Sequence, residues 1–135
     1  MDNMYRQAML EHLKQLQEEL QEIKSILDTE GYLPTIAYRA AERNLQLLIE
    51  ACIGVAKQSL KGQLLAVPSD ARQSFAKLKA NGLDASNIPW DKVVGMRNAI
   101  VHDYLKLNPE RIIDVLNRND HLALIDFAFG RLHSK

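Results

Sequence analysis

The sequence predicts an all-α protein, folded as a single up-and-down helical bundle that spans residues 1–135 as one domain. Apolar side chains recur at steps of three and four residues, the spacing that places them on one face of an α-helix. Helix-start residues and helix-ending glycines separate these runs. Alternating β-branched runs bounded by turns, which would indicate strands, are absent from the sequence. Short connections then favour a bundle.

The first helix is expected from about Asp2 to Leu27, followed by Gly31 as a left-handed cap. Its apolar stripe consists of Leu10, Leu13, Leu16, Leu20, Ile23 and Leu27. The second helix is expected from Pro34 or Thr35 to about Leu60. Its middle is apolar on more than one side, so this helix should be buried on several sides, and Gly54 should allow a close helix crossing.

A shorter third helix should begin at Ser69 or Asp70 as the N-cap and end at Asn81-Gly82, with Phe75 and Leu78 facing inward. Its basic residues are Arg72, Lys77 and Lys79. These residues could flank a basic groove, although an ordinary solvated face is the simpler interpretation.

The fourth helix should begin near Pro89 and Trp90 and end around Tyr104. Asn108 and Pro109 are a cap and first-turn pair, so a fifth helix is expected from Pro109 to about Asn117. A last helix should then cover roughly Asp120 to Leu132.

Composition narrows the class of protein. The formal net charge is zero, so no strongly basic surface for nonspecific nucleic-acid coating follows from the whole chain. No apolar run approaches the roughly 20 residues needed to cross a bilayer, and the first residues lack the apolar core of a signal peptide. We therefore expect a cytoplasmic protein without a membrane partner.

The single cysteine, Cys52, lies in an apolar setting and is expected to be a buried hydrophobic residue. His12, His121 and His133 have no carboxylate or cysteine at metal-ligand spacing, so no metal site is expected. No glycine-rich phosphate loop is present in the sequence either. The sequence thus implies no cofactor.

The most informative segment runs from Arg97 to Tyr104 and interrupts an apolar helix with Arg97, Asn98, His102, Asp103 and Tyr104. Buried polar groups cost free energy unless they find partners, so core packing does not explain this cluster. At about 100° per residue, Asn98 and His102 share one face, whereas Arg97 and His102 lie about 140° apart. Ile100, Val93 and the backbone near Ala99 are left for core contact.

These residue types suit RNA cleavage by internal transfer, which needs an acid, a base and a positive charge near the phosphate. Imidazole changes its protonation state near cellular pH and can serve in either role. One helix supplies a single imidazole, but a two-fold dimer would bring two copies of His102 and Arg97 into one cleft. On spacing alone, ordinary surface or partner-satisfied residues remain the commoner interpretation.

The pattern of Arg97, four residues, His102, one residue and Tyr104 resembles the signature of the HEPN superfamily. More narrowly it resembles the HepT toxins of HepT–MntA toxin–antitoxin systems. Asn98 fits the polar residue that often follows the arginine. The stretch from Tyr38 to Gln46 is similar to the second helix of these proteins, and Trp90 precedes the motif helix as it does there.

The resemblance implies a HEPN-like, homodimeric, metal-independent endoribonuclease acting in a type VII-like toxin–antitoxin system, with tRNA as a candidate RNA substrate. His102 would be the catalytic acid or base, Arg97 would stabilise the phosphate, and Asn98 would orient the site. An MntA-like nucleotidyltransferase antitoxin would neutralise the toxin by transferring AMP from ATP to Tyr104. The added bulk and negative charge would compete with the RNA backbone.

The sequence is also compatible with two alternatives. The chain could be a non-catalytic helical partner that presents Tyr104 to a nucleotidyltransferase. It could also be a plain dimeric scaffold, in which the two motifs lie far apart.

Overall fold

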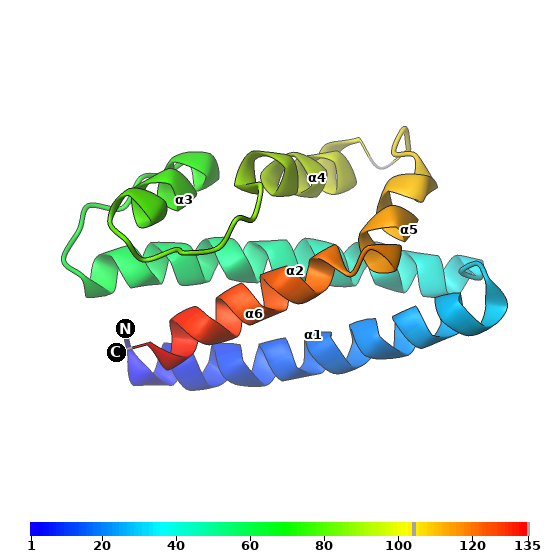
Figure 1. The fold of residues 1–135 in the computed structure, drawn as a ribbon, viewed down its shortest axis with the longest axis horizontal. Helices are drawn as coiled ribbons and strands as arrows, with labels where there is room; N and C mark the ends of the chain where they lie inside the picture. The colour runs from blue at the N-terminus through cyan, green and yellow to red at the C-terminus, as the bar shows by residue number, and fades with distance from the viewer. Residues whose placement is uncertain (104, 135) are drawn as a thin grey trace.

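The computed structural model describes residues 1–103 and 105–134 and confirms the all-α class (Figure 1). Six helices follow one another along these residues. They are α1 (Asn3–Glu30), α2 (Thr35–Gly62), α3 (Ala71–Ala80), α4 (Trp90–His102), α5 (Pro109–Asn117) and α6 (Asp120–His133). Buried side chains from all six helices form one apolar core.

The first two helices form a long antiparallel pair (Figure 1). The carboxylate of Asp2 accepts hydrogen bonds from the backbone N–H groups of Met4 and Tyr5 and so caps the start of α1. α1 continues three residues beyond the predicted end at Leu27. Gly31 then stops it at φ 80°, and the Gly31 N–H donates to the Leu27 carbonyl, as expected for a left-handed cap.

The central helix is α2, which contacts α1, α3, α4 and α6. Its burial on several sides confirms the expectation from its apolar middle. Cys52 is completely buried, and burial raises the pKa of its thiol far above the ordinary range. The predicted burial of this cysteine is therefore confirmed.

A close crossing of α1 and α2 lies at Gly54. A Cβ atom added there would come within 3.1 Å of the Tyr5 hydroxyl oxygen. The Tyr5 hydroxyl is buried and has no hydrogen-bond partner among the residues that the structure describes. The glycine therefore leaves room for an aromatic side chain at the crossing.

The other helices pack around this pair. α3 and α4 lie along one side of α2, and α6 runs beside both α1 and α2 (Figure 1). α6 returns the chain to its start, where the Arg6 guanidinium donates to the Ser134 carbonyl oxygen at 3.4 Å. Within residues 1–103 and 105–134, no helix combines the length and apolar character that a membrane span requires.

Candidate functional site

The start of α4 is anchored by aromatic packing. The Trp90 ring stacks on Phe75 of α3 with 3.8 Å between ring centroids, and its edge meets Phe127 of α6 at 4.7 Å. The indole N–H of Trp90 donates to a carboxylate oxygen of Asp84 at 2.8 Å. Asp84 is itself buried, and its other oxygen accepts from the backbone N–H and the hydroxyl of Ser86. These contacts fix the first turn of the helix that carries the predicted site.

The inner face of α4 makes the core contacts that were predicted and adds two more. Ile100 is buried as expected, and Trp90 and Val94 are buried beside it. Val93, also predicted to contact the core, is partly buried and packs against it. α4 ends at His102, two residues before the predicted end, and Asp103 caps it with its N–H on the Ala99 carbonyl at 2.9 Å.

Two of the three predicted catalytic side chains are joined directly. Nε of Arg97 donates a hydrogen bond to Oδ1 of Asn98 at 2.9 Å, and both side chains are half-buried. The bond leaves the terminal nitrogen atoms of Arg97 able to meet an anionic oxygen. The structure thus places a neutral amide where it can orient the guanidinium.

His102 stands apart from this pair. It is exposed at the end of α4, as is the neighbouring Asp103. Over the described part of the chain, no hydrogen bond joins His102 to Arg97, in keeping with the wide angle expected between them. Tyr104, the predicted modification site, lies outside the described residues.

The basic residues of α3 are largely tied to their own chain. Arg72 donates to the Asp91 carbonyl oxygen at 3.2 Å, and Lys77 donates to the Ala66 carbonyl oxygen at 2.7 Å. Lys79 is exposed. These contacts favour the solvated face over the basic groove, because Arg72 is bonded to the first turn of α4 and Lys77 to the loop before α3.

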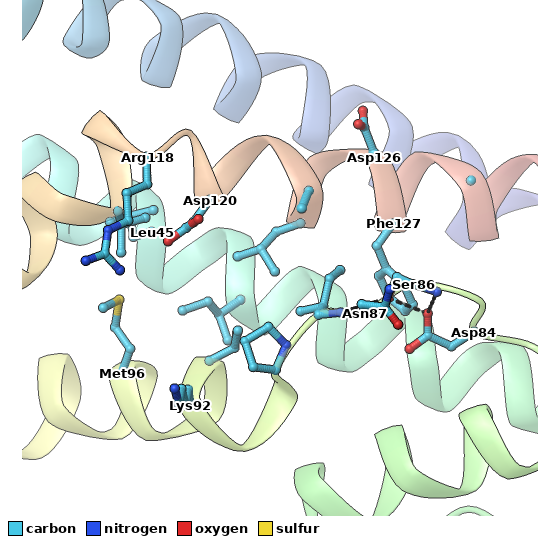
Figure 2. Close-up of a pocket in the computed structure, with 18 of the residues that line it drawn as sticks. Leu45, Asp84, Ser86, Asn87, Lys92, Met96, Arg118, Asp120, Asp126 and Phe127 are labelled. Carbon is cyan, nitrogen blue, oxygen red and sulfur yellow. Dashed lines mark hydrogen bonds between the residues drawn. The ribbon is translucent and has the colours of Figure 1, made fainter.

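A large groove beside α4 was not predicted from the sequence. It has a volume of about 1110 Å³ and lies between α4, the loop before it, α2, α5 and α6. Figure 2 shows Met96 pointing from α4 toward Arg118, with Asp120 at the start of α6 beside it. Arg97, Asn98 and His102 do not line this groove, so it is separate from the predicted site.

Among residues 1–103 and 105–134, no three His, Cys, Asp or Glu side chains are grouped closely enough to hold a metal ion. His121 is buried, and this burial lowers the pKa of its imidazole. It packs in the core and is remote in sequence from the polar segment.

A family model described as "Ribonuclease HepT-like" matches residues 9–128. The chain is similar to the mRNA nuclease HepT of Shewanella oneidensis, with 37% identity over 78 residues. That match covers 56% of this chain and 59% of the relative, so the aligned segment spans less than two thirds of the relative's length.

Two solved structures share nearly the whole fold. One is a tri-AMPylated HEPN toxin of Shewanella oneidensis in complex with an MNT antitoxin, with a TM-score of 0.78 and 26% identity. The similarity covers 96% of this chain and 99% of that chain. The other is a toxin–antitoxin crystal structure with AMP-PNP, with a TM-score of 0.75, 26% identity, and coverage of 95% and 99%.

Proposed function

Because this chain belongs to the HepT-like ribonuclease family, we propose that it is the toxin of a HEPN/MNT toxin–antitoxin pair and a metal-independent endoribonuclease. The observation that carries the proposal is the polar end of α4. There, Arg97 is held by Asn98 and His102 is open to solvent, within the segment that the family model matches. The nuclease activity of the Shewanella relative supports the same reaction class.

His102 acts as the acid or base. Exposure lets its imidazole reach a substrate without displacing packed side chains. As a base it takes the proton of the ribose 2′-hydroxyl, and as an acid it protonates the departing 5′-oxygen. Arg97 stabilises the negative charge that develops on the phosphate between these two events. Asn98 keeps the guanidinium oriented through the 2.9 Å hydrogen bond.

A second copy of the chain completes the site. A single α4 offers one imidazole, and the side chain of Arg97 is joined to Asn98 rather than to His102. A two-fold axis near the end of α4 would bring two histidines and two arginines to one RNA strand. The partly exposed Val101, 38% accessible between these polar residues, fits an apolar contact at such an axis.

Adenylylation of Tyr104 is the proposed control. The tyrosine lies two residues after His102 in the sequence, so an AMP group on it would be close to the catalytic imidazole. Its phosphate would compete with RNA for Arg97. The AMPylated state of the similar HEPN toxin and its complex with an MNT antitoxin support this form of regulation.

The decisive experiment measures RNA cleavage by the purified protein in EDTA. We expect cleavage by the wild type and a loss of about 100- to 10,000-fold in His102→Ala. The matched control is His133→Ala, because His133 is also exposed but lies at the end of α6. Equal cleavage by His102→Ala and wild type would refute the proposal. Copurification with a nucleotidyltransferase without any RNA cleavage would instead identify a non-catalytic binding partner.

A further inference from the structure

A second, smaller pocket lies between the first turns of α2 and the segment that joins α4 to α5. Its volume is about 430 Å³, within the range of roughly 300–1,000 Å³ that is usual for small-molecule sites. The side chains that matter here are Tyr38, Arg39 and Glu42 from α2, and Leu105, Leu107 and Pro109 from the chain that leads into α5. Leu105, one of the residues that line the pocket, follows His102 by three positions in the sequence.

One wall combines an aromatic ring with a cation. The guanidinium carbon of Arg39 lies 5.9 Å from the centroid of the Tyr38 ring. Nη1 of Arg39 also pairs with Oε1 of Glu42 at 3.1 Å. The side chain of Arg39 is 64% exposed while that of Glu42 is 11% exposed, so an entering ligand meets the cation before the carboxylate.

Glu42 explains why these side chains hold their places. It is buried one turn along α2 from both of them, at the i+3 and i+4 spacings that bring helical side chains together. Burial and then the negative charge of Glu42 raise the pKa of Tyr38 to about 12. The phenol therefore stays neutral and does not repel an anion beside it.

This chemistry matches a nucleotide. A purine or pyrimidine base stacks on an aromatic ring, and the leucine side chains that line the same pocket offer further apolar surface. An arginine guanidinium binds phosphate oxygen atoms through paired N–H donors. Leu105, 85% exposed in the free chain, is an apolar side chain that such a base would cover.

We propose that the pocket of Tyr38, Arg39 and Leu105 binds one nucleoside monophosphate unit, with the base against Tyr38 and the phosphate against Arg39. This inference rests on the proposed function, because the proposed function supplies the nucleotide that would bind. The unit is either a residue of the RNA strand at His102 or the adenylyl group carried by Tyr104. Both sources offer a base and a phosphodiester beside the same segment.

Equilibrium binding of free AMP to the unmodified protein tests the pocket. We expect saturable binding whose affinity falls about tenfold or more in Tyr38→Leu and in Arg39→Gln. The first variant loses the stacking contact with the base, and the second loses the contact with the phosphate. Tyr38→Phe keeps the ring and should bind like wild type. Arg43→Gln is the matched control, since Arg43 is an exposed arginine one turn further along α2 and does not line the pocket.

Several results would overturn the pocket assignment. They are an absence of AMP binding by the wild type, unchanged affinity in both pocket variants, and equal weakening in Arg43→Gln. Circular dichroism of each variant shows whether the helices are retained. If a variant loses its helices, an NMR titration of the wild type with AMP replaces it. Chemical-shift changes confined to Tyr38, Arg39 and Leu105 support the pocket, and changes elsewhere overturn it.

Two further measurements distinguish the sources. If the RNA strand supplies the nucleotide, a non-cleavable 2′-O-methyl oligonucleotide displaces AMP, and Arg39→Gln raises KM for RNA more than it lowers kcat. If Tyr104 supplies it, the AMPylated protein no longer binds free AMP. If AMP still binds in the presence of the oligonucleotide and also binds the AMPylated protein, the pocket takes up neither source of nucleotide and the proposal fails. Because AMP binding needs no cleavage, a failure of the ribonuclease proposal would be seen separately.

Discussion

Arg97 and Asn98 are adjacent residues whose side chains form a 2.9 Å hydrogen bond, with the guanidinium as donor and the amide oxygen as acceptor. Successive helical residues point about 100° apart, so this contact requires Arg97 to bend around the helix toward the face of Asn98. On the same count, that face also carries His102. The bond therefore turns the cation toward the side of α4 from which the imidazole projects.

Asn98→Ala should reduce RNA cleavage by about 10- to 100-fold, because a mispositioned guanidinium stabilises the phosphate poorly. If Asn98 acts through Arg97, the Arg97→Ala, Asn98→Ala double variant should be no slower than Arg97→Ala alone. Steady-state cleavage rates of the four proteins make the comparison. Multiplying effects of the two substitutions would contradict a positioning role and indicate that Asn98 contacts RNA independently.

Asp84→Ala should lower the free energy of unfolding by about 2–4 kcal/mol, because it leaves the buried indole N–H of Trp90 without its acceptor. Urea denaturation followed by Trp90 fluorescence measures the change. The control is Asp91→Ala, which removes a carboxylate that lies 3.7 Å from Arg72 and is 87% exposed. No measurable change is expected there. Equal effects of the two variants would show that the Trp90 contact contributes little.

The buried imidazole of His121 predicts a loss of stability in mild acid. Burial, and to a smaller extent the charge of Lys24, lower its pKa, with partial compensation by the Val115 backbone and Asp120. Below the ordinary pKa of about 6.5 the unfolded chain binds a proton that the folded chain resists. Stability should therefore fall as pH decreases from about 6.5 toward the lower pKa of the folded state.

Urea unfolding of the wild type and His121→Leu at several pH values measures this effect. The variant should show a flatter pH dependence, whereas His133→Gln, a change at an exposed histidine, should retain the wild-type slope. A slope that persists unchanged in His121→Leu would assign the pH dependence to other groups.

Tyr5→Phe should stabilise the fold by about 1 kcal/mol, because it removes a buried hydroxyl that has no partner among the described residues. Gly54→Ala should then be better tolerated in the Tyr5→Phe background than in the wild type, since the 3.1 Å approach to the hydroxyl oxygen is relieved. Thermal or urea unfolding of the two single variants and the double variant measures this coupling. If the two substitutions changed the free energy of unfolding by strictly additive amounts, any strain in Gly54→Ala would not come from the Tyr5 hydroxyl.

The helices were predictable because their signals are local. Asn108 and Pro109 start α5 as the sequence indicates, since the Asn108 side chain accepts from the Glu110 N–H. Asp70 caps α3, and Gly31 ends α1, for similarly local reasons. The end of α4 was misjudged, because the polar residues around His102 carry no glycine or proline to mark a stop.

The surroundings of the site were not predictable in the same way. The bond between Trp90 and Asp84 joins a helix to the loop before it, and the stacking on Phe75 joins two different helices. The pocket at Tyr38 similarly needs α2 and residues 105–109 to meet. The pattern of Arg97, Asn98 and His102 was visible in the sequence because all three belong to one helix.

Because Trp90 anchors the first turn of α4, any tilt of this helix about Trp90 displaces the residues at its other end. At 1.5 Å per residue, His102 lies about 18 Å from this pivot and Arg97 about 10 Å from it. A tilt of about 10° around Trp90 would move His102 by about 3 Å and Arg97 by about 2 Å. Misplacement of a catalytic group by about 1 Å can lower the rate by about 100-fold. The stacking of Phe75 on Trp90 therefore determines the positions of Arg97 and His102, although it contacts neither of them.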